Sequence, residues 1–369
     1  MLNYVIFAGV LTFIISLVSI PIIIKLSHRF NLFDSTSHRK IHSKDTSRIG
    51  GLGIFIAFFP AACYLILKYS QNYNPYFLIA GMLIAFLCGF VDDLVRIRVR
   101  YKLLIQIISA SMIVLSGLMI KDLRIYTFFY INFGVFSYPL TIFWIIAFMN
   151  AVNLIDGMDG LSTGIVLIAN FFLIVISLIS GNYPVLALAV LLECSILGFY
   201  IFNFPPAKIF LGDGGAYFIG FMYSVFPLMG VKKSAALTVF LIPMILMLIP
   251  ISDIVQVILK RYKDGKNLFH PDKNHLNHRL MNIGFSTKEI LAVVYTYTAI
   301  LGIFSLIMVA VHSKFTMFLL GFIILIVGIS FYMLNRAETL ISDLKQESKS
   351  SKDLLRKNLD NIRIFRKIS

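Results

Sequence analysis

Residues 150–164, NAVNLIDGMDGLSTG, lie between two apolar runs at 138–149 and 165–179. The segment spaces two amides and two carboxylates at intervals of three, at Asn150, Asn153, Asp156 and Asp159. On an α-helix, positions three apart drift by about 60° per step, so the four side chains cannot share one face. Gly157 and Gly160 therefore predict that a helix ends here and that the backbone turns around a polar site. Taken alone, the pattern equally suits a solvated loop after a hydrophobic span.

The composition predicts an all-α polytopic membrane protein. Of the 369 residues, 59% are hydrophobic and only 14% are charged, and the mean hydropathy is +0.86. A soluble domain of this length does not need so much apolar sequence. The three cysteines lie inside apolar runs without metal-site spacing, which indicates a packing role.

About eleven transmembrane helices are predicted, at 3–26, 51–68, 75–91, 103–120, 138–150, 161–180, 184–202, 214–230, 235–259, 290–311 and 314–335. The alternating segment 128–137 is expected to form a small outer hairpin. The loops on one side, with the C-terminal stretch, hold 27 of the 33 lysines and arginines. This bias predicts an external N-terminus and a cytoplasmic C-terminus. We expect a membrane domain over 1–335 and a basic tail over 336–369.

The expected cytoplasmic loops carry further polar clusters. The first loop places cations and histidines ahead of Gly50 and Gly51, an arrangement that suits either a phosphate site or a simple membrane anchor. Asp92 and Asp93 end an apolar helix and precede four basic residues, which favours a functional site over a balanced helix end. Asp213 lies among glycines in LGDGG, after the helix-breaking pair Pro205 and Pro206.

The last long loop contains HPDKNHLNHRL, residues 270–280. Its histidines His275 and His278 could bind zinc, but the surrounding cations favour hydrogen bonds to phosphate or sugar oxygens. Mg²⁺ takes one or two protein carboxylates and completes its shell with substrate phosphates and water. Acidic and basic clusters on one membrane face therefore predict Mg²⁺-dependent phosphoryl transfer, with Mn²⁺ as a substitute metal.

Five motifs carry a resemblance: RKIHSKDTSRIGG, DDLVRIRVRYKLLIQ, NAVNLIDGMDGL, FNFPPAKIFLGDGG and HPDKNHLNHRL. In this order they resemble the polyprenyl-phosphate N-acetylhexosamine-1-phosphate transferases, a glycosyltransferase 4 type family. The resemblance implies an eleven-span, N-out fold with a cytoplasmic active site in the bacterial inner membrane. Asn277 departs from the family, because many bacterial relatives have a histidine there.

The resemblance implies a role for each matching residue. The catalytic residues would be Asp92, Asp93, Lys102 and His278. The metal ligands would be Asp213 and Asn153. The substrate-binding residues would be Lys40, His42, Asn153, Asp156, Asp159, Asn203, His275 and Arg279. Asn150 is expected to be structural.

The implied reaction transfers an N-acetylhexosamine 1-phosphate, with N-acetylglucosamine as the expected sugar, from the UDP-sugar to undecaprenyl phosphate and releases UMP. A phosphomonoester nucleophile is largely dianionic at neutral pH, which favours direct attack over an aspartyl-phosphate intermediate. This reaction would be the first membrane step of cell-envelope polysaccharide or teichoic-acid synthesis. The alternatives are a phospho-N-acetylmuramoyl-pentapeptide transferase and a nucleotide-sugar or lipid-phosphate transporter. Membrane lipids are expected partners, nucleic acid is not, and a homodimer is left open.

Overall fold

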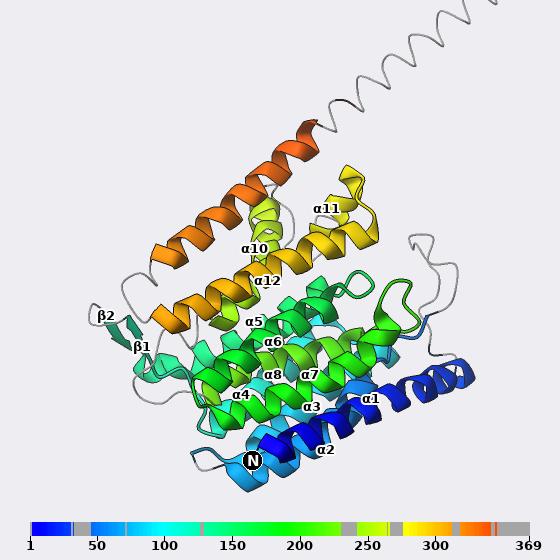
Figure 1. Ribbon diagram of the computed structural model, residues 1–369, viewed down its shortest axis with the longest axis vertical. Coiled ribbons are helices and arrows are strands. Elements are labelled where there is room, and N and C mark those ends of the chain that lie inside the picture. The colour runs from blue at the N-terminus through cyan, green and yellow to red at the C-terminus, as the bar shows by residue number, and fades with distance from the viewer. Residues whose placement is uncertain are drawn as a thin grey trace, which may run out of the picture.

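A computed structural model describes residues 2–30, 32, 46–70, 72–125, 129–229, 242–263, 265, 276–311, 318–340 and 344. Over these ranges the chain is a bundle of long helices (Figure 1). The first half contributes α1 (Leu2–Phe30), α2 (Gly51–Tyr69), α3 (Pro75–Val95), α4 (Val99–Leu115), α5 (Ser137–Ile155) and α6 (Leu161–Ile179). The second half contributes α7 (Tyr183–Asn203), α8 (Gly212–Met229), α10 (Leu248–Lys263), α11 (Leu276–Ile283), α12 (Thr287–Val311) and a last helix, Phe318–Leu340.

Eight helices in the described ranges are long and apolar enough to cross a membrane. They correspond to α1, α2, α3, α5, α6, α7, α12 and the last helix. The prediction of an all-α, multi-pass membrane protein is therefore confirmed. Helix α4 has 17 residues and α8 carries a carboxylate in its first turn, so these two are weaker spans. The count of eleven and the orientation stay predictions.

The small hairpin lies earlier in the chain than the sequence suggested. Strand β1 (Asp122–Ile125) pairs antiparallel with β2 (Phe129–Asn132), and Asp122 lies opposite Asn132. Residues 134–136, which were expected to belong to the hairpin, instead form a short 3₁₀ turn, η1 (Gly134–Phe136), that leads into α5. The alternation of aromatic residues after 128 thus marks one strand and a turn, and the partner strand precedes it.

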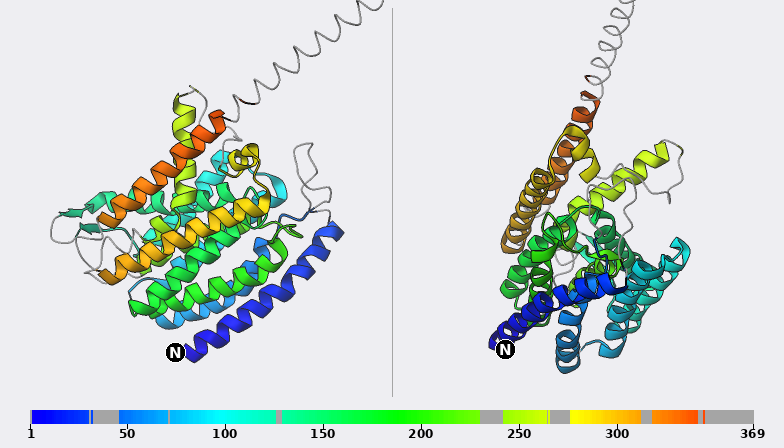
Figure 2. Two further views of the ribbon diagram at one scale, coloured as in Figure 1. Left: turned by 45° about the horizontal axis from the view of Figure 1, so that its top comes forward. Right: turned by 90° about the vertical axis from the view of Figure 1, so that its right-hand side faces the viewer.

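Helix α8 is the centre of the bundle. It packs against α2, α3 and α5, and nearly all its side chains from Gly214 to Leu228 are buried. Around this core, α1 packs along α7, while α12 packs on α6 at the other side (Figures 1 and 2). A helix that is apolar on all sides must be enclosed by others, which explains why α8 is central.

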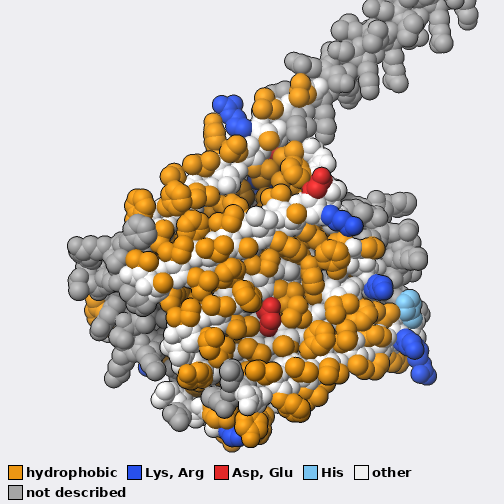
Figure 3. All heavy atoms as spheres, viewed as in Figure 1, with side chains coloured by type: hydrophobic (Ala, Val, Ile, Leu, Met, Phe, Trp, Pro, Cys, Tyr) orange, Lys and Arg blue, Asp and Glu red, His pale blue; other side chains and the backbone are white. Residues whose placement is uncertain are grey.

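The outer surface of the bundle is itself hydrophobic. In Figure 3 apolar side chains form an almost continuous face, and the few Lys and Arg side chains lie near its edges. Large apolar side chains exposed on the bundle include Phe7, Phe143 and Phe171. A contiguous apolar surface of this size is expected where lipid replaces water as the solvent.

The last helix continues beyond the predicted boundary between membrane domain and tail. The sequence placed that boundary after residue 335, but the helix runs to Leu340. Arg336 and Glu338 therefore lie on the same helix as the apolar residues before them. Where the membrane domain ends along this helix is not shown, so the boundary after residue 335 stays a prediction.

Candidate active site

The centre of the site is a lysine held between two carboxylates from different helices. Lys102 Nζ lies 2.5 Å from Asp92 Oδ2 and 3.0 Å from Asp213 Oδ2. The other oxygen of Asp213 accepts a hydrogen bond of 2.9 Å from Asn153 Nδ2. Four residues from α3, α4, α5 and α8, which belong to three of the motifs, thus meet at one end of the bundle.

The two adjacent aspartates have different partners. Successive residues of an α-helix point about 100° apart, so Asp92 and Asp93 leave the last turn of α3 in different directions. Asp92 faces Lys102, and its Oδ1 also accepts the backbone N–H of Ile97 at 2.6 Å. Asp93 instead accepts the backbone N–H groups of Asp213 and Gly214, both at 2.9 Å. The first N–H groups of a helix have no partner within it, so Asp93 completes the start of α8.

Glycines allow these helix ends to approach so closely. A Cβ atom at Gly89 would lie 2.2 Å from the carbonyl carbon and oxygen of Asp213. Gly212 has a φ of +75°, and a Cβ there would lie 1.9 Å from the carbonyl oxygen of Arg48. The LGDGG motif therefore needs its first glycine both for backbone conformation and for space.

The opening segment of the sequence forms the second part of the site. Helix α5 ends at Ile155 and α6 begins at Leu161, so residues 156–160 form a turn, as predicted. The Ser162 hydroxyl donates a hydrogen bond to Asp156 Oδ1. Burial raises the pKa of the Asp156 carboxyl to about 8, while the Ser162 hydrogen bond opposes this shift. Nearby Asp213 and Asp93 raise the same pKa further, which indicates that Asp156 belongs to the same electrostatic cluster.

Asp159 and Asn203 connect this turn to the neighbouring loop. Asp159 is 6% exposed, and its Oδ2 accepts the backbone N–H of Ala207 at 3.0 Å. Asn203 is 2% exposed; its Oδ1 accepts from Gly160 N and Thr163 Oγ1, and its Nδ2 donates to the Ile209 carbonyl. The resemblance had implied that both residues contact substrate. In this structure their described hydrogen bonds fix the backbone on either side of the site.

The described part of the histidine motif, residues 276–280, lies on the short helix α11, and Arg279 on this helix is bound to protein groups. Its guanidinium makes two hydrogen bonds of 2.9 Å to the Glu338 carboxylate. It also donates to Gln256 at 3.1 Å and to Asn335 at 2.5 Å. Arg279 is 6% exposed, so it joins α10, α11 and the last helix. His278 is partly buried on the same helix, and Asn277 is buried.

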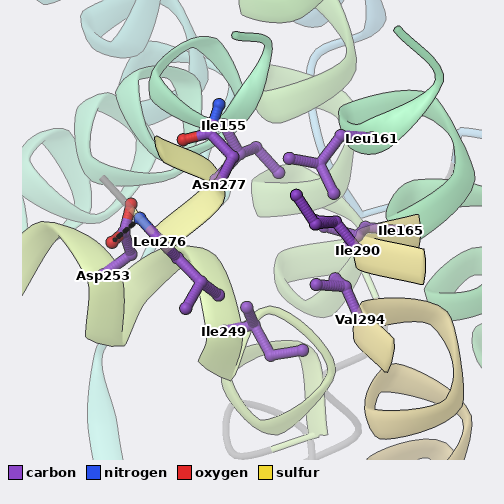
Figure 4. Close-up of a pocket in the computed structure, with 9 residues that line it drawn as sticks. All are labelled: Ile155, Leu161, Ile165, Ile249, Asp253, Leu276, Asn277, Ile290 and Val294. Carbon is purple, nitrogen blue, oxygen red and sulfur yellow. Dashed lines mark hydrogen bonds between the residues drawn. The ribbon is translucent and has the colours of Figure 1, made fainter. Parts of the chain in front are cut away.

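A small pocket lies among the end of α5, the start of α6 and helices α10, α11 and α12 (Figure 4). Its walls are mainly aliphatic: Ile155, Leu161, Ile165, Ile249, Leu276, Ile290 and Val294. Two polar residues, Asp253 and Asn277, also face it. Asp253 Oδ1 accepts the Leu276 N–H at 2.8 Å and so caps α11, a contact drawn as a dashed line in Figure 4. The pocket lining suits helix packing rather than a charged nucleotide.

The structure therefore brings together Asp92, Asp93, Lys102, Asn153 and Asp213 in one cluster, and Asp156 lies near enough for Asp213 and Asp93 to raise the pKa of its carboxyl. Three predicted site residues, Lys40, His42 and His275, lie outside the described residues. Within the described ranges, no group of three His, Cys, Asp or Glu side chains has the arrangement of a metal site. Carboxylate oxygens at Asp213 and an amide at Asn153 are nevertheless hard donors of the type that suits Mg²⁺.

Several residues that support the site were missed from the sequence. Ser162 and Gln106 carry no charge and lie inside apolar runs, and Glu338 lies in the segment read as a tail. Gln106 is 2% exposed and exchanges amide hydrogen bonds with Asn150 at 3.0 and 3.4 Å. The spacing of Gln106, four residues after Lys102, was the available signal, because residues four apart share one helix face.

Known proteins resemble this chain along most of its length. Residues 75–231 match the family model described as glycosyl transferase family 4. The chain is 34% identical over 361 residues to a probable undecaprenyl-phosphate N-acetylglucosaminyl 1-phosphate transferase of Bacillus subtilis, covering 95% of this chain and 98% of that protein. It is 30% identical to a decaprenyl-phosphate N-acetylglucosaminephosphotransferase of Mycobacterium leprae, covering 75% and 77%.

The name of a third relative gives a different substrate. The chain is 28% identical to a phospho-N-acetylmuramoyl-pentapeptide-transferase of Staphylococcus carnosus, over 81% of this chain and 97% of that protein. The matched region of the family model contains the Asp92, Lys102, Asn153 and Asp213 cluster. The chain therefore belongs to the polyprenyl-phosphate N-acetylhexosamine-1-phosphate transferases of glycosyl transferase family 4, and it is a sugar-phosphate transferase.

Proposed function

We propose that this protein transfers N-acetylglucosamine 1-phosphate from UDP-N-acetylglucosamine to undecaprenyl phosphate and releases UMP. The transferred N-acetylglucosamine phosphate follows the names of the B. subtilis and M. leprae relatives, and undecaprenyl phosphate follows the name of the first, which aligns over nearly its whole length. UDP as the carrier of the sugar phosphate is what the family resemblance implies. The observation that carries the proposal is the Lys102 ammonium, held between Asp92 and Asp213 at the ends of apolar helices. A cation in this position serves a reaction between two phosphate groups at a membrane surface.

In the proposed reaction a phosphate oxygen of the lipid attacks the β-phosphorus of the nucleotide sugar. A new O–P bond forms, and the bond from the β-phosphorus to the oxygen bridging to the α-phosphorus breaks. The electron pair stays on UMP, so no redox partner is needed. Because a phosphomonoester is largely dianionic at neutral pH, its oxygen attacks without a strong protein base.

The residues around the reacting phosphates then have distinct tasks. Lys102 stabilises the negative charge that develops on the diphosphate. Asp92 orients Lys102 through their 2.5 Å contact, and Asp93 fixes the backbone that carries Asp213. Asp156 is half-buried beside this cluster, and we assign it the task of positioning the nucleotide. His278 is assigned to the sugar or its phosphate.

Mg²⁺ is the proposed cofactor, and Asp213 with Asn153 would hold it. The Asn153 amide donates its NH₂ to Asp213, which leaves its carbonyl oxygen as a donor toward a cation. When bound, the metal supplies Lewis-acid stabilisation of the diphosphate charge. Two oxygen ligands from protein suit this metal, which takes its other ligands from phosphates and water.

The proposed location is the cytoplasmic leaflet of the bacterial inner membrane. The basic residues concentrate on the loops that carry the motifs, and cytoplasmic loops are rich in Lys and Arg. The reaction is proposed as the first membrane step in the synthesis of a cell-envelope polymer.

The test uses purified protein in detergent with Mg²⁺, undecaprenyl phosphate and a panel of UDP-sugars, with UMP release as the readout. UDP-N-acetylglucosamine is expected to give the fastest release. Faster release with UDP-N-acetylmuramoyl-pentapeptide would assign the chain to the activity named for the S. carnosus relative. No release with any UDP-N-acetylhexosamine would overturn the proposal.

A further inference from the structure

A chain of two tyrosine hydroxyls ends on the turn that carries Asp156. Tyr295, on α12, donates its hydroxyl hydrogen to the carbonyl oxygen of Gly160 at 2.6 Å. Its oxygen lies 3.0 Å from the hydroxyl of Tyr200, on α7. Because Tyr295 uses its only hydrogen on Gly160, Tyr200 must be the donor between the two tyrosines. Hydrogen bonds in such a chain strengthen each other.

Gly160 is the residue at which this turn is held from both sides. Its N–H donates to Asn203 Oδ1 at 3.2 Å, while its carbonyl accepts from Tyr295. It has a φ of +72°, a left-handed conformation that few other residues adopt. Tyr200 and Asn203 lie three residues apart on one face of α7. From this face Asn203 accepts the Gly160 N–H, and Tyr200 bonds to the tyrosine that holds the Gly160 carbonyl. The turn is therefore positioned by groups far away in the sequence.

The packing of α12 on α6 places Tyr295 where it can reach this carbonyl. A Cβ atom at Gly164 would lie 2.0 Å from Tyr295 Oη and 2.1 Å from its Cζ. A side chain there would displace the tyrosine ring. Gly164, the last residue of the segment that the sequence singled out, thus provides the space for this contact.

The segment that carries Tyr295 also contacts the beginning of the turn at 156–160. A Cβ atom at Gly157 would lie 3.1 Å from Asn277 Nδ2, on α11. Helix α11 ends at Ile283 and α12 begins at Thr287, so a short connection joins the two helices. One continuous segment therefore contacts Gly157 through α11 and Gly160 through α12, and it brackets the turn that carries Asp156.

We propose that Tyr295 is a positioning residue for the nucleotide-sugar donor, acting through its hydrogen bond to Gly160. This inference rests on the proposed function, because it assigns Asp156 to the nucleotide. Tyr295 itself does not touch the Lys102 cluster in this arrangement. Its loss should therefore weaken donor binding and leave both the chemical step and the lipid acceptor unaffected.

The test compares steady-state kinetics of Tyr295→Phe with those of Tyr297→Phe. Tyr297 lies two residues further along α12, about 200° around the helix, and is the matched control. Tyr295→Phe is expected to raise KM for UDP-N-acetylglucosamine about fivefold, the effect of one net hydrogen bond. Its kcat and its KM for undecaprenyl phosphate should stay within about twofold of wild type. Tyr297→Phe should resemble wild type in all three constants.

Two further variants keep the inference testable if Tyr295→Phe is poorly folded. Tyr200→Phe removes only the second hydroxyl and should raise the donor KM by a smaller factor, about twofold. Gly164→Ala should displace the Tyr295 ring and raise the donor KM at least as much as Tyr295→Phe. An unchanged donor KM in all three variants would overturn the inference, and so would equal changes in the KM of both substrates. If wild type itself releases no UMP, the proposed function fails instead.

Discussion

Asp93 holds the backbone of Asp213, since its Oδ1 accepts the Asp213 N–H at 2.9 Å and its Oδ2 accepts the next N–H at 2.9 Å. We expect Asp93→Ala to lower the free energy of unfolding by about 2 kcal/mol, because hydrogen bonds to charged groups are the stronger ones. It should also lower kcat by about tenfold or more through displacement of Asp213. Thermal unfolding in detergent and UMP release measure the two effects.

Asp92→Ala is the matched control for that variant. Its carboxylate faces Lys102 rather than the start of α8, so its main effect should be on kcat. If Asp93→Ala unfolded at the wild-type temperature with unchanged activity, the capping role of Asp93 would be wrong.

Lys102→Gln should lower kcat by about 10²–10³, the range seen when one group that stabilises transition-state charge is removed. The side chain stays polar and of similar length, so the protein should still fold. Lys102→Arg keeps the charge but changes its geometry, and an intermediate kcat is expected. A kcat for Lys102→Gln within about threefold of wild type would exclude Lys102 from charge stabilisation.

The buried Gln106 and the half-buried Asn150 form an amide pair that should show coupling in a double-mutant cycle. Asn150→Leu leaves the buried Gln106 amide without this partner and should cost about 1–3 kcal/mol. Gln106→Leu should cost less, because Asn150 is half-buried and still donates to the Ile146 carbonyl. The double variant removes both amides and should be less destabilised than the sum of the two single changes. Additive losses would mean that the two amides do not support each other.

The contact between Arg279 and Glu338 predicts that the last helix supports the histidine motif. Glu338→Ala should destabilise the protein by about 1–3 kcal/mol, because Arg279 is then left buried without its carboxylate. It should also raise KM for the UDP-sugar, because α11 loses its anchor. Arg279→Lys keeps a charge but not the paired hydrogen bonds, so it should be only partly tolerated. If Glu338→Ala left both stability and KM unchanged, Arg279 would be free to act on substrate, as the motif alone suggested.

Asp156 predicts a pH dependence of stability. Its pKa of about 8 in the folded protein lies above the value of an exposed aspartate, so the folded state binds the proton more tightly. Stability of wild type should therefore fall as pH rises from about 4 to 8, by up to about 1.4 kcal/mol per pH unit. Asp156→Asn has no such charge to bury, so its thermal midpoint relative to wild type should rise over this range and level off above pH 8. A difference that does not vary with pH would contradict the burial of this carboxyl.

The sequence was informative where charge stands out against an apolar background. The aspartates of α3 and α8 could be singled out because they lie at the ends of apolar runs, whereas the role of Lys102 was implied by the family resemblance. The turn after Ile155 could also be predicted, since Gly157 and Gly160 interrupt a helical pattern. These are local signals that composition and spacing carry.

What could not be predicted depends on contacts between distant segments. The hydrogen bonds of Asn203 and the ion pair of Arg279 involve residue types that suit both substrate binding and structure. Only the packing shows that these groups already have protein partners. The hairpin was misplaced for a related reason, because β1 has little alternation of its own and is defined by its pairing with β2.

The central claim is that the sugar moves together with its phosphate. The most direct measurement incubates the protein, Mg²⁺ and undecaprenyl phosphate with UDP-N-acetylglucosamine labelled with ³²P at the β-phosphate, and follows the label. The account predicts label in the lipid product and an equal amount of unlabelled UMP, with Lys102→Gln greatly slowed. Label retained in released UDP, with unlabelled sugar on the lipid, would contradict it.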